Sequence, residues 1–166
     1  MSILDGWRFC PRCAAELADA GDHLHCPGCG YDAWPGAVPG TQALLVQDGR
    51  VMLGRRAIEP GRGKWDIPGG FLGEDEHPLD GLKREFLEET GLEIEPTAFL
   101  GFWIEDYLDG RKILCLTWLA RRVGGEERLD ELDELRWFAP GELPAQEEYA
   151  FPTFAEILSV WREQHA

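Results

Sequence analysis

The chain lacks the segments that would carry it into or across a membrane. Its first residues, 1–8, do not combine a basic region with an apolar one, and no stretch approaches 18 uninterrupted apolar residues. A secretory leader needs both regions together, and a membrane-crossing helix needs about 20 predominantly apolar residues. We therefore expect a cytoplasmic protein with no membrane partner.

Positive charge is also scarce. Lys and Arg number 16 against 31 Asp and Glu, so the net charge is -15 and the pI is near 4.6. Duplex nucleic acids and anionic membranes are bound by neutralising many phosphates with cations. The composition disfavours a nucleic-acid partner and favours a small molecule that carries its phosphates together with a metal.

Repeats and low-complexity tracts are absent, and 166 residues suffice for one catalytic domain with a small appendage. Residues 1–36 are rich in Cys, Gly and Pro, and residues 34–40 hold two prolines and two glycines, which is typical of a stiff, turn-prone linker. We predict a small metal-binding module over residues 1–36 and a catalytic domain over residues 37–166.

Four of the five cysteines form two Cys-x-x-Cys pairs, Cys10/Cys13 and Cys26/Cys29. In a reducing compartment such pairs are more often metal ligands than disulfides. Four thiolates close a tetrahedral Zn²⁺ site, so the pattern predicts a structural zinc ribbon. Bound iron and a redox dithiol are the alternatives, and His23 and His25 are alternative ligands.

The fifth cysteine, Cys115, lies in an apolar strand pattern between Leu114 and Leu116. A buried apolar residue is its expected role, with a nucleophile as the alternative.

The remaining pattern predicts strands and two helices. Asp48-Gly49 between two apolar runs indicates an antiparallel hairpin of residues 41–47 and 50–55. A broken strand over residues 65–72 is interrupted by Pro68-Gly69-Gly70. Further strands are expected over residues 98–105, 112–121 and 135–138. The helices are expected over residues 78–90, starting at Pro78 and stopped by Gly91, and over residues 152–164.

Three carboxylates share one face of the first predicted helix: Glu85, Glu88 and Glu89 stand at positions i, i+3 and i+4. Each like-charge pair at this spacing costs an isolated helix about 0.2–0.5 kcal/mol. A hard divalent cation, Mg²⁺ or Mn²⁺, would neutralise the cluster. The alternative is a solvated acidic helix face.

The wider spacing distinguishes these two interpretations. Gly70, Glu76, Arg84-Glu85, Glu88-Glu89 and Gly91-Leu92 stand in a pattern that resembles the Nudix box at every position. The resemblance implies an α/β fold, an α-β-α sandwich with a mixed sheet, here preceded by the small zinc ribbon. It also implies a metal-dependent pyrophosphohydrolase that cleaves a nucleoside diphosphate linked to another group.

The resemblance also implies roles for individual residues. Glu85, Glu88 and Glu89 resemble the metal-ligand carboxylates, and Gly70 resembles the residue that offers a backbone carbonyl. Arg84 is expected to orient the glutamates, and a surface ion pair with Glu88 is its alternative role. The catalytic base comes either from the box, as Glu88 or Glu89, or from a later loop. In that later loop, Glu131 stands where family members often carry a catalytic glutamate.

Substrate contacts are expected from scarce cations and from aromatic residues. Phosphate oxygens are expected to meet some of Arg55, Arg56, Arg62 and Lys64. Trp65, Trp103 and Tyr107 are candidates for stacking on a base, and burial in the core is their alternative role.

Signals for the substrate disagree. A zinc ribbon before a Nudix domain resembles NADH pyrophosphatases and a group similar to ADP-ribose and FAD pyrophosphatases. Residues 97–107 lack the Ser-Gln-Pro-Trp-like segment of the first group, whereas residues 150–153 are similar to the second. Tyr107 stands where diadenosine polyphosphate hydrolases carry a similar residue.

We expect an ADP-containing dinucleotide or nucleotide sugar, such as ADP-ribose or FAD, as substrate. NADH and diadenosine polyphosphates are the alternatives. An inert nucleotide-sensing module is the alternative from another class, and removal of a nucleic-acid cap is a further one. A homodimer is common among similar proteins.

Overall fold

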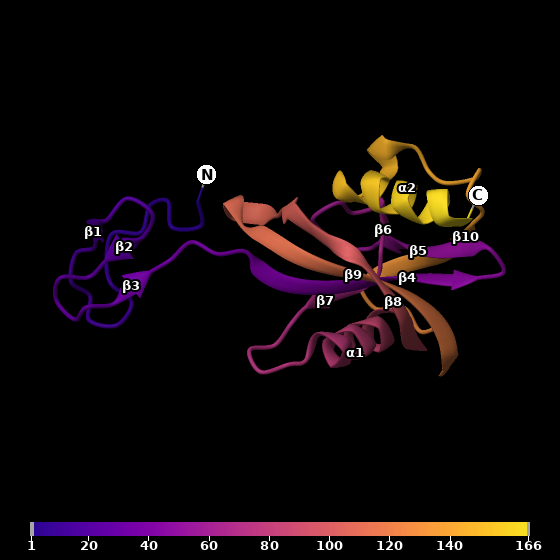
Figure 1. Ribbon diagram of the computed structural model, residues 1–166, viewed down its shortest axis with the longest axis horizontal. Helices are drawn as coiled ribbons and strands as arrows, with labels where there is room; N and C mark the ends of the chain where they lie inside the picture. The colour runs from indigo at the N-terminus through magenta and orange to yellow at the C-terminus, as the bar shows by residue number, and fades with distance from the viewer. Residues whose placement is uncertain (1, 166) are drawn as a thin grey trace.

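The structure is a computed structural model that describes residues 2–165, so Met1 and Ala166, the outer ends of the two predicted domains, lie outside the described residues. It has a mixed sheet between two helices, with α1 (Pro78–Thr90) on one face and α2 (Thr153–His165) on the other (Figure 1). The predicted α-β-α sandwich is therefore confirmed. No helix within residues 2–165 is long and apolar enough to cross a membrane.

The large sheet has the strand order β10-β5-β4-β9-β8, with β6 paired to β5 and β7 paired to β4. Its central pair, β4 and β9, is parallel, and the other pairs are antiparallel. The strands are β4 (Val38–Gln47), β5 (Arg50–Arg56), β6 (Trp65–Asp66), β7 (Gly69–Phe71), β8 (Leu92–Asp106), β9 (Lys112–Gly125) and β10 (Leu132–Phe138), and the 3₁₀ helices are η1 (Leu108–Gly110) and η2 (Gln146–Glu148).

The hairpin of β4 and β5 turns at Asp48-Gly49, as predicted. Both residues have positive φ, 50° and 71°. A two-residue hairpin turn of type I′ requires this conformation at both positions.

Helix α1 begins and ends at local signals. The Nδ1 atom of His77 accepts a hydrogen bond from the Leu79 amide, Pro78 occupies the first turn, and Gly91 ends the helix at φ 74°. A Cβ atom at Gly91 would lie 2.2 Å from the Glu126 carbonyl oxygen, so glycine is required there.

Two apolar cores fix the helices on the sheet. Leu82 and Phe86 of α1 pack with Leu45 and Met52 on one face of the sheet. On the other face, α2 contributes Phe154, Ile157, Leu158 and Trp161 to a second core. Because Leu82 and Phe86 face the sheet, the carboxylates of α1 lie along its flanks, and those at one flank reach β7.

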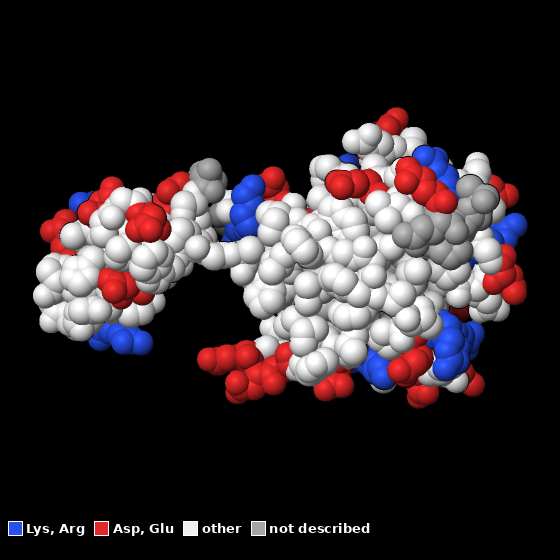
Figure 2. Space-filling view, in the orientation of Figure 1, with Lys and Arg blue, Asp and Glu red and all other residues white. Residues whose placement is uncertain are grey.

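The chain before residue 34 forms a separate small sheet. Strands β1 (Ala18–Asp19), β2 (Leu24–His25) and β3 (Asp32–Ala33) pair antiparallel in chain order. Residues 34–37 have no regular structure and lead directly into β4. Figures 1 and 2 show this part beside the main body, joined to it by a narrow connection.

Candidate functional site

Two glycines of β7 bring its backbone against two glutamates of α1. The Gly69 amide donates a hydrogen bond of 2.9 Å to Oε2 of Glu89. A Cβ atom at Gly70 would lie 2.3 Å from Oε2 of Glu85, closer than any real contact. The Pro-Gly-Gly bend therefore allows the strand to approach the helix and leaves carbonyl and carboxylate oxygens side by side.

These residues line one wall of a cavity of about 370 Å³. Glu85, Glu89, Gly70 and Glu131 gather at one end, from three separate segments of the chain. Residues of β8, β9 and the segment leading into α2 also line the cavity. The structure thus brings together four of the residues to which the sequence assigned the reaction.

Burial and neighbouring carboxylates disfavour ionisation of Glu89. Burial is the main cause, and the charges of Asp66, Glu85 and Glu131 add to it, so the pKa of Glu89 rises to about 9 although the Gly69 amide acts in the opposite direction. No Lys or Arg in the described part of the chain forms an ion pair with Glu89. A bound cation would supply the compensating charge.

Arg84 connects the other carboxylates of the loop and helix. Its guanidinium donates to Glu76 through Nε and Nη2, to Glu85 at 2.7 Å, to Glu88 at 3.2 Å and to the Phe71 carbonyl. Glu88 does not line the cavity, and its side chain is 60% exposed. The predicted Arg84–Glu88 surface pair is therefore present, together with the orienting contact to Glu85.

We expect Arg84→Leu to raise the pKa of Glu76 by about one unit or more. The hydrogen bond from Arg84 is the main cause that lowers this pKa from 4.5 to about 2, with the Gly73 amide second. The pairing therefore stabilises the fold above about pH 4.5 and is lost as the pH falls toward 2. A carboxyl-carbon NMR titration of Glu76 measures the shift.

Lys83→Leu is the matched control, because Lys83 pairs with Glu95 at 2.8 Å instead. A Glu76 pKa that stays near 2 in the Arg84 variant would contradict the assignment.

The predicted substrate contacts separate into two groups. Arg56 and Tyr107 line the cavity. Arg55, the neighbour of Arg56 on β5, points to the opposite face and lies 3.5 Å from Glu134 of β10, because strand side chains alternate. Lys64 lines a shallow surface depression outside this cavity.

The two predicted tryptophans also lie away from the cavity lining. Trp65 is 6% exposed and packs edge-on against Phe138, with the Arg136 guanidinium over its ring. Trp103 is partly buried against the same core. For both, the structure shows the alternative role in the core.

Asp66, Glu105 and Phe151 also line the cavity and were not anticipated from the sequence. Asp66 pairs with Arg56, and Glu105 accepts a hydrogen bond from Thr153. Phe151 lines the cavity beside Tyr107. A signal for Glu105 was present in principle: it stands two residues before Tyr107, and strand residues at i and i+2 share a face.

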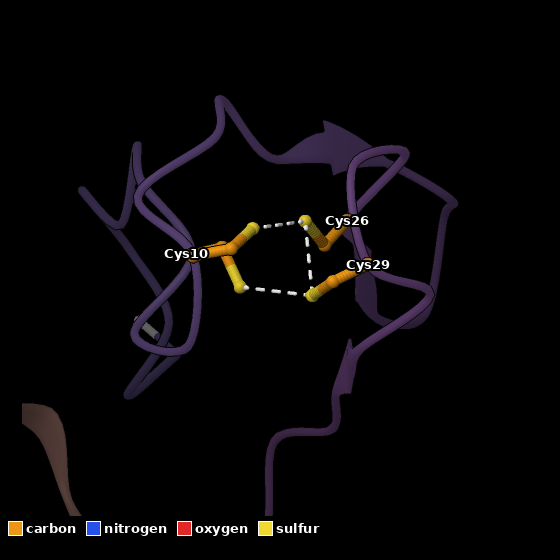
Figure 3. A group of neighbouring side chains, drawn as sticks. Cys10, Cys26 and Cys29 are labelled. Carbon is orange, nitrogen blue, oxygen red and sulfur yellow. Dashed lines mark hydrogen bonds between the residues drawn. The ribbon is translucent and has the colours of Figure 1, made fainter.

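The four N-terminal cysteines converge on one point. Figure 3 shows the side chains of Cys10, Cys26 and Cys29 directed toward one another. The Sγ atoms of Cys10 and Cys29 are 3.7 Å apart, those of Cys13 and Cys26 3.5 Å, and those of Cys26 and Cys29 3.6 Å. A tetrahedron with Zn–S bonds of about 2.3 Å has sulfur atoms about 3.8 Å apart, so the geometry suits Zn²⁺.

His23 and His25 are engaged elsewhere. The Nδ1 atom of His23 lies 2.8 Å from Asp22, and that of His25 lies 2.6 Å from Asp32. Within residues 2–165, the cysteine group alone places three or more ligand atoms within 4.8 Å of one another. The fifth cysteine, Cys115, is buried, and burial raises the pKa of its thiol, which agrees with its expected apolar role.

Comparison with known proteins identifies similar sequences. A MutT-like protein of Streptomyces ambofaciens is 36% identical over 101 residues, which cover 60% of this chain and 62% of the relative. The NAD-capped RNA hydrolase NudC of Stutzerimonas stutzeri is 29% identical over 142 residues, covering 83% and 50%. The chain thus spans less than two thirds of the length of these relatives.

Solved structures share the fold. A NUDIX hydrolase from Nitrosomonas europaea superposes with a TM-score of 0.79 at 26% identity, covering 95% of this chain and 91% of that one. A MutT NUDIX hydrolase from Burkholderia pseudomallei gives 0.64 at 28% identity, covering 75% and 97%. The NUDIX domain profile matches residues 38–158, which include the β7 glycines, all of α1 and the cavity. This chain therefore belongs to the Nudix family.

Proposed function

We propose that the protein is a divalent-metal-dependent pyrophosphohydrolase that cleaves a nucleoside diphosphate linked to another group, with ADP-ribose or FAD as the leading substrates. The observation that carries this proposal is the convergence of Glu85, Glu89, Glu131 and the Gly70 backbone at one end of a single cavity. Carboxylate and carbonyl oxygen donors of this kind are suited to Mg²⁺ or Mn²⁺.

The metal would be held by Glu85, Glu89 and the Gly70 carbonyl, with Glu88 beside them on the same helix. The bound metal would supply neutralisation of the pyrophosphate charge and a reactive water at neutral pH. Arg84 would keep Glu85 directed at the site through its 2.7 Å hydrogen bond. The Gly69 amide would hold one oxygen of Glu89 and leave the other for the metal.

Glu89 and Glu131 are our candidates for the base that removes the proton from the attacking water. Glu131 lines the cavity from the loop before β10 and has a left-handed backbone conformation, with φ 62°. This conformation is uncommon for a residue other than glycine and concentrates at functional sites. Glu88 is a weaker candidate, because its side chain is directed to solvent and Arg84.

On the substrate side, Arg56 and Tyr107 remain our candidates for binding, since both line the cavity. Arg56 is already paired with buried Asp66, so its role would be to fix the cavity wall and to add positive potential for phosphate. Arg55, Lys64 and Trp65 have no such position and are not part of the proposal.

For the N-terminal part, we propose a structural zinc ribbon over residues 1–36, ahead of a catalytic domain over residues 37–166. The convergence of the four cysteine Sγ atoms within 4.8 Å of one another supports this division. A site closed by four thiolates offers no open position for a substrate.

A second candidate substrate is a dinucleotide of the NADH type, free or at an RNA end. It is favoured by the NudC relative, whose match covers 83% of this chain, more than that of the MutT-like protein. The net charge of -15 argues for the free dinucleotide.

Hydrolysis measured against ADP-ribose, FAD, NADH, diadenosine polyphosphates and nucleoside triphosphates, with and without Mg²⁺, tests the proposal. We expect Mg²⁺-dependent release of a nucleoside monophosphate from at least one dinucleotide or nucleotide sugar. Mg²⁺-independent turnover would contradict the metal mechanism. Nucleotide binding without turnover of any compound would favour the alternative of an inert sensing module.

A further inference from the structure

Two pairs of residues meet at the part of the cavity formed by β8 and the segment before α2. Glu105, the next-to-last residue of β8, Tyr107, which follows β8, and Phe151, which precedes α2, line the cavity, and Thr153 is the first residue of α2. Thr153 donates a 2.8 Å hydrogen bond to Oε1 of Glu105. The rings of Tyr107 and Phe151 lie 6.0 Å apart at an interplanar angle of 23°. A polar pair and an aromatic pair thus stand side by side.

Within the described residues Glu105 forms no ion pair, although the charge of nearby Arg56 acts to lower its pKa. It is 4% exposed, and Thr153 is its one hydrogen-bond partner among the described residues. The guanidinium of Arg56 is engaged by the Asp66 carboxylate and the Pro60 carbonyl. Burial raises the pKa of Glu105 to about 7. An ionised carboxylate that is buried with a single hydrogen bond costs free energy unless a ligand donates further hydrogen bonds to it.

The backbone separation of Gly70 and Glu105 suits a nucleotide. Gly70 pairs with Thr41 of β4, β4 pairs with β9, and Glu105 of β8 pairs with Ile113 of β9. Gly70 aligns through Thr41 and Leu116 with Phe102 of β8, so Glu105 lies three strand spacings away, roughly 14 Å across the sheet, and three residues farther along β8. Phosphates at the α1 end would therefore leave the nucleobase, rather than the ribose, beside Glu105.

From this juxtaposition we propose that Glu105, Thr153, Tyr107 and Phe151 form an adenine-binding subsite, in which Glu105 accepts a hydrogen bond from the 6-amino group while the base stacks on the aromatic pair. The inference rests on the proposed function for the position of the phosphates. Flat aromatic surfaces bind every base, so the carboxylate supplies the discrimination.

The hydrogen-bonding pattern selects adenine among the bases. Thr153 occupies Oε1 of Glu105, which leaves Oε2 as the acceptor for a single amino group. Guanine would present two adjacent donors and requires both carboxylate oxygens. Cytosine offers one amino group but a smaller stacking surface than a purine.

Calorimetric titration of the full chain with nucleoside monophosphates tests the subsite without turnover. We expect AMP to bind about 10- to 100-fold more tightly than purine riboside 5′-monophosphate, which lacks only the amino group, and more tightly than GMP. In Glu105→Ala the ratio of AMP to purine riboside monophosphate affinity should fall to about 1. A structural role would weaken both nucleotides equally and leave the ratio unchanged.

Asp106→Ala is the matched control, because Asp106 is the next residue on β8, is 80% exposed on its side chain and pairs with Lys112. The wild-type affinities for AMP, purine riboside monophosphate and GMP test the proposal even if Glu105→Ala does not fold. Equal affinities for the two purine nucleotides, a preference for GMP, no binding of AMP, or an unchanged ratio in Glu105→Ala would each overturn it. Because binding is measured, the result stands apart from any failure of hydrolysis.

Discussion

Glu89→Gln is expected to lower kcat by about 1,000-fold while leaving the fold intact. Glu89 joins α1 to β7 through the Gly69 amide and faces the cavity between Asp66 and Glu85. The amide oxygen of Gln still accepts the Gly69 hydrogen bond, so the backbone geometry is kept. What is lost is the negative charge that would bind the metal or receive the proton. Steady-state kinetics on the best substrate, at saturating Mg²⁺, measure the effect.

Glu95→Gln is the control for this substitution. Glu95 lies on β8, outside the cavity, and its contact is an exposed ion pair with Lys83. We expect wild-type kcat for this variant. A Glu89→Gln protein that retains more than about a tenth of the wild-type kcat would remove Glu89 from the catalytic group.

Cys26→Ser is expected to abolish zinc binding and to unfold the N-terminal ribbon. Cys26 is fully buried, and its Sγ atom lies close to those of Cys13 and Cys29. Structural Zn²⁺ in zinc-finger peptides contributes about 10–16 kcal/mol of apparent binding free energy at pH 7, and in such small modules this is the folding free energy. With strands of two residues each, the ribbon has little core to replace it. Metal analysis and the NMR signals of Trp7 and Trp34 report the loss.

The fifth cysteine provides the control for the zinc prediction. Cys115 is buried in the large sheet, far from the cluster in the chain, so Cys115→Ser should retain one zinc per chain. If Cys26→Ser keeps one zinc per chain, or if the ribbon signals are unchanged after chelation, zinc does not hold this part together.

Elements with local signals were predicted from the sequence most accurately. The bounds of α1 follow from Pro78 and Gly91, and the first hairpin follows from Asp48-Gly49. The hydrogen bonds that define these elements are short-range, so the determining residues stand next to one another in the chain.

Strand β8 begins at Leu92, before the predicted start at residue 98, for an identifiable reason. β8 contains Pro96 and Gly101, residues that normally mark the end of a strand. It lies at the edge of the sheet, where proline is tolerated, and the ladder with β9 accommodates both residues through register shifts near them. Edge position is a property of the whole sheet and is not encoded locally.

For the candidate site, too, the residues in a local motif were predicted from the sequence, and those brought together over long chain separations were not. Glu85, Glu89 and Gly70 follow from a motif within about twenty residues, and the structure places them together. Glu105 and Thr153 are 48 positions apart, and neither carries a motif. Trp65 is kept out of the cavity lining by its packing against Phe138, a residue that lies 73 positions later in the chain.

The parallel pairing of β4 with β9 has a consequence for how the chain folds. The buried hydrogen bond from Gln42 to Thr117 spans 75 positions, and closing a loop of that length is a slow entropic step. Helix α1 and β7, by contrast, meet across a short loop. We therefore expect the contact between β7 and α1, with Glu85 and Glu89, to form early in refolding. The part of the cavity that includes Glu105 is expected to form only in the rate-limiting step.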